Sequence, residues 1–379
     1  MKPFDVIIVG GGIIGAVTAC ELRKAGLSVA VLDKGAPGEE ASLAAVGVLA
    51  PHAGPHLQTP FVHFLRENLS VYPGFIREIE EETGMNTEFC PSGLLYLAFD
   101  EEGEKELEER HGWQVQAGVK VEWLSGDEIR AREPWVGKDV RKGVYFSEDC
   151  HVDNVKLMGA VLKRAEKLGV VFFPRTAALK IIIEDGKVRG LETSGGKFET
   201  SAVVDAAGAW ANFDASLPFD IPVKPSRGQI LTFKHDVPLF KHMIHLRGTY
   251  LVNRSDGRLL VGTTVESAGY NKDVTAKGLN KLSEGLLKVN PELAFLKFAE
   301  VWAGLRPRSR DSQPMIGKTP VDGLFLAAGH FRNGVLAAPL TARVLLEIME
   351  GKNPSFDITP FDPARFKKKS PAFLRKCSN

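Results

Sequence analysis

The sequence predicts an α/β fold, in which a Rossmann-like dinucleotide-binding domain is interleaved with an α+β substrate domain built on a large antiparallel sheet. Three observations lead to this prediction. A glycine-rich turn joins an apolar strand to a helix at the start of the chain, a meander of short strands fills the middle, and further strands separated by turn residues follow it. The 379 residues are enough for two domains.

The composition is typical of a soluble globular enzyme, with 44% hydrophobic and 25% charged residues. A formal net charge of +1 creates no general attraction to nucleic acid. No segment has the roughly 18 uninterrupted apolar residues of a membrane helix, so we expect no membrane association. The cysteines lack metal-ligand spacing and are interpreted as free thiols in a reducing compartment, which favours the cytoplasm; they are Cys20, Cys90, Cys150 and Cys377.

A dinucleotide-binding motif opens the chain. An apolar strand over 5–9 leads into Gly10–Gly15, which fits G-x-G-x-x-G, and a helix follows through Ala25. The glycines let the backbone approach a pyrophosphate, and the helix N-terminus supplies partial positive charge. A second strand ends at Asp33, where an acid can accept hydrogen bonds from a ribose. The same residues resemble a secretory signal, but Asp5 and three glycines interrupt the apolar run.

The middle of the chain favours FAD over NAD, a choice that the first motif alone leaves open. Residues 172–212 read as strands joined by turns at Asp185-Gly186 and Gly195-Gly196. They close on an apolar strand over 202–204 and the small residues Ala206-Ala207-Gly208, which can pack beside the first glycine turn. A simple NAD domain seldom contains such a meander, whereas it is common where a flavin dinucleotide lies extended.

A second unusual loop, "AAGHFRNGV" over 327–335, joins an apolar run at 323–326 to a helix over 336–349. A plain connection needs one turn residue. This loop instead combines Gly, His, Arg and Asn, which brings backbone N–H groups and a cation toward a flat polar partner. The alternative interpretation is an ordinary capped loop between a strand and a helix.

With these motifs in place, the sequence resembles the D-amino-acid oxidase family of FAD-dependent amine oxidoreductases, and most closely its glycine-oxidase group. The resemblance runs from residue 6 to about 340. It is carried by "VIIVGGGIIG", "ASLAAVGVLAPHA", "PSGLLYLAF", "VVDAAGAWA", "GTYLVNRSDGRLLVGTT", "WAGLRPRSRDSQPMIG" and "AAGHFRNGVLAAP", which occur in the family's order and spacing.

The resemblance implies oxidation of an amine by hydride transfer to N5 of a non-covalent FAD. The imino acid would hydrolyse to an oxo acid and ammonia or an amine, and O2 would reoxidise the flavin to give hydrogen peroxide. Glycine, sarcosine and small D-amino acids are the implied substrates, and a homo-oligomer, as in tetrameric relatives, and a role in thiamine biosynthesis are also implied. Two alternatives stay open: a D-amino-acid or proline dehydrogenase that passes electrons to a quinone or partner subunit, and a non-catalytic flavin-binding module.

The resemblance also implies which residues contact FAD. They are Gly10, Gly12, Ile13, Ile14, Gly15, Asp33, Lys34, Ser42, Ala44, Ala45, Gly47, Val48, Ala178, Ala207, Gly208, Trp210, Gly304, Arg306, His330, Arg332, Asn333, Gly334, Val335 and Leu336. A structural hydrogen bond is the alternative for His330. The absence of cysteine between Arg306 and Ile316 argues against covalent flavin attachment.

The implied catalytic residues are Tyr250, Arg306 and Arg332, with Arg306 and Tyr250 holding the substrate carboxylate. An ion pair with Asp311 is the alternative for Arg306, and packing is the alternative for Tyr250. Val48 and Val265 complete the implied substrate pocket. Each stands where a larger residue such as Met is expected, which leaves the pocket size open.

His52 and His56 have H-x-x-x-H spacing, but no acidic partner in the right register accompanies them, so we expect no metal site. We expect the FAD-binding domain from residues 1–85, 145–222 and 310–360, the substrate domain from 86–144 and 223–309, and a basic tail over 361–379. Within the substrate domain we expect strands over 93–99, 228–233, 249–254, 258–264 and 298–305, a hairpin turn at 255–257 and a surface helix over 275–290.

Overall fold

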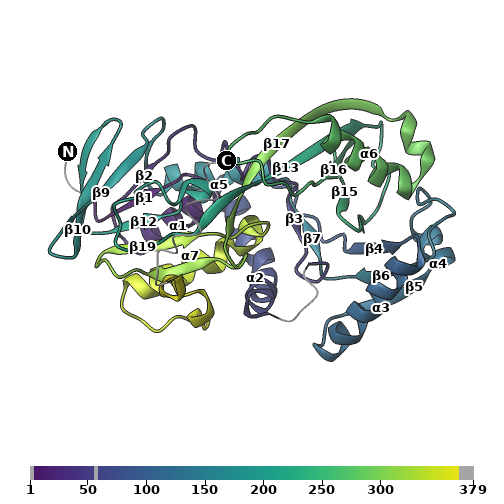
Figure 1. The fold of residues 1–379 in the computed structure, drawn as a ribbon, viewed down its shortest axis with the longest axis horizontal. Coiled ribbons are helices and arrows are strands. Elements are labelled where there is room, and N and C mark those ends of the chain that lie inside the picture. Colours follow the sequence, from purple (N-terminus) through teal and green to yellow (C-terminus); the bar gives the residue numbers. More distant parts are fainter. Residues whose placement is uncertain (1–3, 55–58, 367–379) are drawn as a thin grey trace. The chain divides into compact units, whose positions relative to one another are not determined.

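The computed structural model describes residues 4–54 and 59–366, and within it the chain crosses repeatedly between two units (Figure 1). The first unit takes its residues from Met1–Leu43, Met158–Pro225 and Arg306–Asn379, and the second from Ala44–Leu157 and Ser226–Leu305. His56, Cys377 and the tail beyond residue 366 lie outside the described residues. The predicted boundaries of the FAD and substrate domains concern where ligands bind, and they stay a prediction.

In the described part of the first unit, the predicted parallel sheet is present and has six strands. Its central strand β1 pairs in parallel with β2 and β12, so that Val9 lies opposite Leu32 on one side and Asp205 on the other. The antiparallel strand β18 closes one edge. In spatial order the strands are β18 (Met315–Lys318), β19 (Leu324–Ala328), β12 (Val203–Asp205), β1 (Val6–Val9), β2 (Val29–Leu32) and β8 (Val171–Phe173).

Both faces of this sheet are covered, as a parallel sheet requires. The helices α1 (Ile13–Lys24) and α7 (Gly334–Met349) pack against each other and against the strands (Figure 1). The alternate strand residues Ile7 and Leu32 instead join Ile181 and Leu191 of the meander in one buried cluster. The meander consists of β9 (Ala178–Glu184), β10 (Lys187–Thr193) and β11 (Gly196–Glu199).

The predicted turns of the meander are confirmed. Asp185 and Gly186 have φ values of 52° and 75°, the left-handed pair that a tight hairpin requires. Gly196, with φ of 113°, begins β11 at the second turn. A short 3₁₀ helix, η1 (Gly208–Trp210), follows β12, and two more, η3 (Thr359–Phe361) and η4 (Pro363–Phe366), end the described chain.

The described part of the second unit is built on the predicted large sheet, which has eight strands. The 255–257 hairpin is confirmed by the hydrogen bond from Arg254 N to Arg258 O at 2.8 Å. β14 and β4 pair in parallel, whereas β13 and β16, β14 and β15, β15 and β16, β4 and β6, and β5 and β6 pair antiparallel. The strand order is β17 (Lys297–Ser309), β13 (Val223–Lys234), β16 (Arg258–Gly262), β15 (Thr249–Asn253), β14 (Met243–Leu246), β4 (Leu94–Ala98), β6 (Lys142–Phe146) and β5 (Val121–Ser125).

The predicted surface helix is α6 (Ala276–Val289), which Thr275 caps through a hydrogen bond from Gly278 N. Its residues Leu282 and Leu286 belong to the buried cluster of the large sheet. The sequence analysis did not predict three further helices of this unit. They are α2 (Pro60–Thr83), α3 (Glu101–Gln116) and α4 (Gly126–Arg132). The remaining elements are the pair β3 (Val48–Leu49) and β7 (Cys150–His151), the 3₁₀ helix η2 (Pro291–Phe295), and α5 (Asn154–Lys167), which leads back into the first unit.

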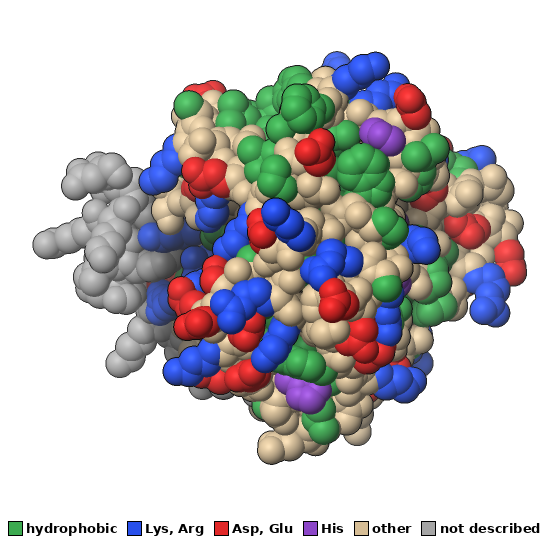
Figure 2. Space-filling view, turned by 90° about the vertical axis from the view of Figure 1, so that its right-hand side faces the viewer, with side chains coloured by type: hydrophobic (Ala, Val, Ile, Leu, Met, Phe, Trp, Pro, Cys, Tyr) green, Lys and Arg blue, Asp and Glu red, His purple; other side chains and the backbone are tan. Residues whose placement is uncertain are grey.

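The surface carries both signs of charge. Figure 2 shows Lys and Arg side chains interspersed with Asp and Glu on the face in view.

Among residues 4–54 and 59–366, no helix is both long enough and apolar enough to cross a membrane. The predicted location in the cytoplasm stays a prediction.

Gly15→Ala should destabilise the first unit, because a Cβ at Gly15 would lie 1.9 Å from the carbonyl oxygen of Gly10. We expect a loss of about 2–3 kcal/mol in the free energy of unfolding, since the helix would have to move away from β1. Urea unfolding followed by circular dichroism measures it.

The matched control is Gly112→Ala, also inside a helix, where no described atom lies within 4 Å of the added Cβ. This change should stabilise by about 0.5–1 kcal/mol through helix propensity. Equal effects of the two substitutions would show that the contact between β1 and α1 is not tight.

Candidate active site

The predicted pyrophosphate turn is built by close backbone packing. Gly10 has φ of +103°, and a Cβ there would lie 2.4 Å from Ala206 O at the end of β12. α1 begins after Gly12, and Ile13 N donates to Ser42 Oγ at 2.9 Å. The sequence prediction that small residues at 206–208 pack beside this turn is confirmed. The arrangement leaves a glycine-lined surface at a helix N-terminus, which suits a phosphate.

Asp33 is oriented toward this turn from the end of β2. Its Oδ2 accepts a hydrogen bond from Gly11 N at 2.8 Å, and its Oδ1 accepts one from Gly35 N at 2.9 Å. A carboxylate has further lone pairs, so Asp33 can still accept from a ribose hydroxyl. Beside it, Lys34 Nζ lies 3.1 Å from the centre of the Trp210 ring, a cation–π contact that joins two predicted FAD residues.

Asp205 is a buried acid beside the same turn that the sequence analysis did not single out. It ends β12, and its Oδ1 accepts from Ala207 N at 2.9 Å. Burial raises the pKa of its carboxyl to about 8, because the charged form is poorly solvated there. Asp205 is therefore largely protonated at neutral pH and fixes the Ala206–Gly208 turn without placing a full charge beside it. The sequence signal that could have identified Asp205 is an acidic residue at the end of an otherwise apolar strand.

The second unusual loop lies against the end of β17. Phe331 N donates to Pro307 O at 2.9 Å, and Asn333 N donates to His330 O at 3.0 Å. Gly329 and Phe331 have φ values of +81° and +50°, so the chain turns sharply before α7 begins at Gly334. The first N–H groups of a helix have no intrahelical acceptor. α7 therefore offers donors and partial positive charge at its start, as a polar ring edge would need.

Arg306 belongs to the same part of the first unit. It is half-buried in β17 and directly precedes Pro307, whose carbonyl binds the loop. Asp311, the partner of Arg306 in the alternative interpretation, pairs with Arg365, whose Nε lies 2.9 Å from Asp311 Oδ2. The guanidinium of Arg332 lies 5.1 Å from the centre of the Phe331 ring. The structure thus brings Arg306 and the 330–333 loop together.

In the second unit, Tyr250 is held in a stack of rings. It lies in β15 opposite His245 of β14, and the two rings stack with centres 4.1 Å apart and planes 6° apart. Tyr96 of β4 packs on His245, also at 4.1 Å. Because flanking rings fix the ring plane, the Tyr250 hydroxyl has a defined direction. This stack was not predicted. His245 and Tyr250 lie on adjacent strands of one hairpin, whereas Tyr96 comes from β4, far earlier in the chain.

The predicted FAD residues Ala44, Gly47 and Val48 belong to the second unit, as Tyr250 does. Trp302 Nε1 donates to Ala44 O at 3.2 Å, and Gly304 has no space for a side chain, because a Cβ would lie 2.5 Å from that of Ala44. Val46 is a buried member of a cluster that includes Tyr96 and Leu260, with Val48, Tyr250 and Trp302 packed against it. The second unit therefore gathers implied flavin and substrate residues around one apolar cluster.

Two implied residues lie at the edges of these groups. Val265 lies just beyond β16, and its side chain is 39% exposed. Ala178, the implied adenine contact, is half-buried at the start of β9 in the first unit. The roles of all these residues stay predictions.

His52 has a buried acidic partner that the sequence analysis did not find. Its Nδ1 lies 2.6 Å from Oδ1 of Asp149, and both side chains are buried. The sequence analysis found no acidic partner because the two residues are 97 positions apart. Burial raises the pKa of Asp149, and His52 opposes that shift. Within the described ranges, no group of three or more His, Cys, Asp and Glu side chains could hold a metal.

His330 gives a pH test of this site. It is 1% exposed, its Nε2 lies 3.2 Å from Thr341 Oγ1, and burial lowers its pKa to about 3. Below pH 6.5 the imidazole of His330 is protonated in the unfolded chain, whereas it stays neutral in the folded chain until the pH approaches 3. The free energy of unfolding should therefore fall as pH falls from about 6.5 toward 3, by up to about 1.4 kcal/mol per pH unit from this residue.

His330→Gln should remove this contribution, so the difference in unfolding free energy between variant and parent should depend on pH below 6.5 and level off above it. Urea unfolding between pH 4.5 and 7.5 measures the difference. His63→Gln, at an exposed position of α2, controls for the loss of one imidazole. A constant difference across the range would contradict a neutral buried His330.

Known proteins with similar sequences and structures agree with this geometry. Glycine oxidase of Geobacillus kaustophilus (strain HTA426) is 32% identical over 366 residues, which cover 96% of this chain and 97% of that protein. The crystal structure of glycine oxidase from Geobacillus kaustophilus superposes with a TM-score of 0.92 over 96% of this chain and 98% of that one.

Two further relatives have other names. The bifunctional protein ThiO/ThiG of Synechocystis sp. (strain ATCC 27184 / PCC 6803 / Kazusa) is 34% identical over 369 residues, which cover 96% of this chain and 54% of that protein. Hydrogen cyanide synthase subunit HcnC of Pseudomonas protegens (strain DSM 19095 / LMG 27888 / CFBP 6595 / CHA0) is 30% identical over 405 residues, which cover 97% of each.

The glycine cradle at Gly10 and Gly15, the Asp33 carboxylate and the two helix N-termini fit a flavin dinucleotide. Residues 5–348 match the family described as DAO, FAD dependent oxidoreductase. This chain therefore belongs to the DAO family of FAD-dependent oxidoreductases, and FAD is its cofactor.

Proposed function

We propose that this enzyme oxidises the amine of glycine and of other small amines such as sarcosine and small D-amino acids. The products are an oxo acid, ammonia or an amine, and hydrogen peroxide from O2. The observation that carries the proposal is the similarity to the glycine oxidase of Geobacillus kaustophilus over nearly the full length of both chains, in sequence and in structure.

FAD, when bound, supplies the two-electron acceptor that takes a hydride from the substrate. The first unit holds its dinucleotide part in this proposal. Gly10, Gly12 and Gly15 let the backbone approach the pyrophosphate, and Asp33 accepts from the ribose. The N-terminus of α7 would offer backbone N–H donors and partial positive charge to the flavin ring.

The substrate is held through its carboxylate. Arg306 offers a planar fork of N–H donors that matches both carboxylate oxygens, and Tyr250 donates one further hydrogen bond from its hydroxyl. Arg332 adds positive charge from the 330–333 loop. These contacts aim the substrate Cα–H, and the neutral amine needs no side-chain base. Positioning and a preorganised cationic site then account for most of the rate.

The nearer alternative is a dehydrogenase that passes electrons to a quinone or partner subunit. The relative named hydrogen cyanide synthase subunit HcnC shares with this alternative only that its name calls it a subunit. A homo-oligomeric state and a role in thiamine biosynthesis stay predictions, as does the non-covalent attachment of FAD.

An anaerobic absorbance titration of the purified flavoprotein with glycine, sarcosine, D-alanine, D-proline and L-proline tests the proposal, followed by admission of air with peroxide detection. Bleaching by glycine or sarcosine and prompt peroxide would support an oxidase. Bleaching only by proline, or slow reoxidation in air, would favour the dehydrogenase. No bleaching would remove the substrate proposal and leave FAD binding intact.

Arg306→Ala should lower kcat/KM for glycine roughly 100-fold or more, because loss of a bidentate ion pair costs about 2.7 kcal/mol in the transition state. FAD should stay bound, as its absorbance after desalting reports. Arg310→Ala, at an exposed position further along the chain, is the control and should keep kcat/KM within about twofold. Turnover by Arg306→Ala with an unchanged KM would overturn the carboxylate assignment.

Tyr250→Phe should raise KM for glycine about tenfold, the effect of losing one hydrogen bond to a charged group. Its stacking on His245 should persist, so the melting temperature should change little. Tyr96→Phe is the matched control. The ring of Tyr96 packs on the same histidine, and its hydroxyl donates to Glu106 Oε1 at 2.9 Å. Steady-state kinetics on both variants would contradict the assignment if their KM values matched.

A further inference from the structure

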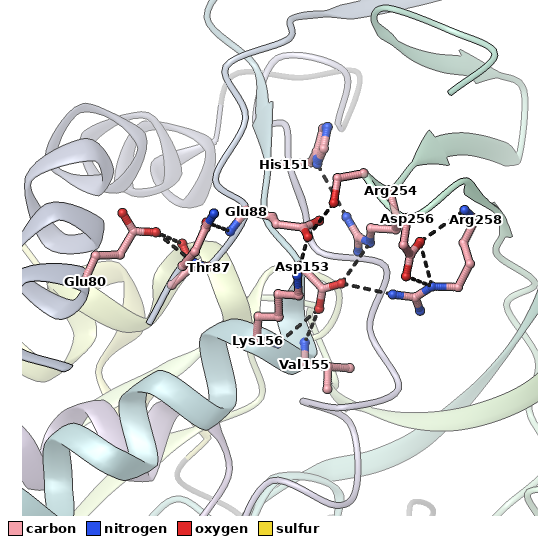
Figure 3. Close-up of polar contacts among 12 residues, drawn as sticks. Glu80, Thr87, Glu88, His151, Asp153, Val155, Lys156, Arg254, Asp256 and Arg258 are labelled. Carbon is pink, nitrogen blue, oxygen red and sulfur yellow. Dashed lines mark hydrogen bonds and ion pairs between the residues drawn. The ribbon is translucent and has the colours of Figure 1, made fainter. Parts of the chain in front are cut away.

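A buried guanidinium lies at the end of the strand that carries Tyr250. Arg254 directly follows β15, and it is 3% exposed. Its Nη2 donates to Val46 O at 2.6 Å and lies 3.4 Å from Asn154 Oδ1. Its Nε lies 3.5 Å from Asp153 Oδ2, and its Nη1 lies 3.4 Å from His151 Nδ1 (Figure 3). Its shortest contact is thus with a backbone carbonyl rather than with its counter-ion.

The charges around Arg254 are arranged to keep it fixed. Asp153 Oδ1 accepts from Val155 N at 2.9 Å and Lys156 N at 3.1 Å at the start of α5, which leaves Oδ2 facing Arg254 and Arg258 (Figure 3). Arg258 is in turn held by Asp256 at 2.8 Å. The anionic partner of Arg254 is therefore itself immobilised from two sides.

His151 completes the enclosure of the guanidinium as a neutral group. Burial, with a smaller effect of Arg254, lowers its pKa to about 4, so the ring carries no charge at neutral pH. Its Nδ1 can then accept from Arg254, which places the ring proton on Nε2. His151 also pairs with Val48 between β7 and β3, so it contacts the end of the segment that Arg254 binds.

That segment, Ala44–Val48, is held by hydrogen bonds at three of its carbonyl groups, from three residues that are far apart in the sequence. Trp302 Nε1 donates to Ala44 O at 3.2 Å, Arg254 Nη2 donates to Val46 O, and Val152 N donates to Gly47 O at 2.9 Å. Gly47 has φ of +77°, and a Cβ there would lie 2.0 Å from Val152 O. A surface connection would leave these carbonyls to water. Here they are fixed by tertiary contacts.

We propose that Arg254 is a positioning residue that fixes the segment Ala44–Val48 against β15, and thereby sets the implied flavin contacts in register with Tyr250. This inference rests on the proposed function, which assigns flavin contact to this segment. Arg254 reaches it from the strand that holds Tyr250, so one side chain ties the two together. Its planar fork donates to Val46 O and faces Asp153 at once, which a single ammonium group cannot do in the same geometry.

Arg254→Lys tests the inference, because it keeps the positive charge and removes the fork. We expect the dissociation constant of FAD to rise at least tenfold, the absorbance spectrum of bound FAD to change, and kcat/KM for glycine to fall at least tenfold. FAD binding to apoprotein is followed by the quenching of flavin fluorescence.

Arg132→Lys is the matched control, since it makes the same change at a paired guanidinium of the second unit, where Arg132 Nη1 of α4 donates to Glu122 Oε2 at 2.9 Å. It should leave the FAD dissociation constant and kcat/KM within twofold. A melting temperature measured for each holoenzyme separates a loss of stability from a loss of positioning.

Trp302→Phe provides a second variant if Arg254→Lys fails to fold, because it removes the donor to Ala44 O and keeps an aromatic ring. It should raise the FAD dissociation constant threefold or more. Values within twofold of the parent for every variant that folds, together with an unchanged flavin spectrum, would overturn the inference. FAD binding is measured without substrate, so a failure of the glycine proposal would leave this test intact.

Discussion

The close approach of three backbone segments at the start of the first unit is the constraint on which the rest depends. Gly10 leaves β1 under the carbonyl of Ala206, and Gly15 lies under the carbonyl of Gly10. A side chain at either position would separate the strand from the helix or from its neighbour β12. Because the three segments meet here, the N-terminus of α1 lies beside the carboxyl ends of parallel strands, where open α/β sheets bind ligands.

The candidate site is assembled from loops that distant residues hold in place. Ser42 binds the first turn of α1 across 29 positions, Arg254 binds Val46 across 208, and Trp302 binds Ala44 across 258. Each contact satisfies a backbone group that would otherwise lose a hydrogen bond when water is excluded. The loops consequently gain the rigidity of the sheets to which they are bound, which a site that must align a substrate requires.

Sequence reasoning reached the parts that depend on local signals. The glycine motif, the 185–186 turn, the 255–257 hairpin, α6 and α7 each follow from residue type and spacing within a short window. The Asp149 partner of His52, the packing of Tyr96 on His245 and the contact of Arg254 with Val46 could not be reached in this way. Each joins residues that only the tertiary fold brings together, so no local pattern encodes them.

The contacts that only the tertiary fold makes are also those on which the proposed reaction would depend. The proposed amine oxidation by hydride transfer would gain little from an additional acid or base, but it would depend steeply on the alignment of the Cα–H with its acceptor. In that proposal the important groups are those that limit movement: the fork of Arg306, the ring stack on Tyr250 and the Arg254 guanidinium that binds Val46. A buried charge is expensive to hold. The position of Arg254, with its shortest bond to a loop carbonyl, is consistent with a cost that is offset by a fixed site rather than by stability alone.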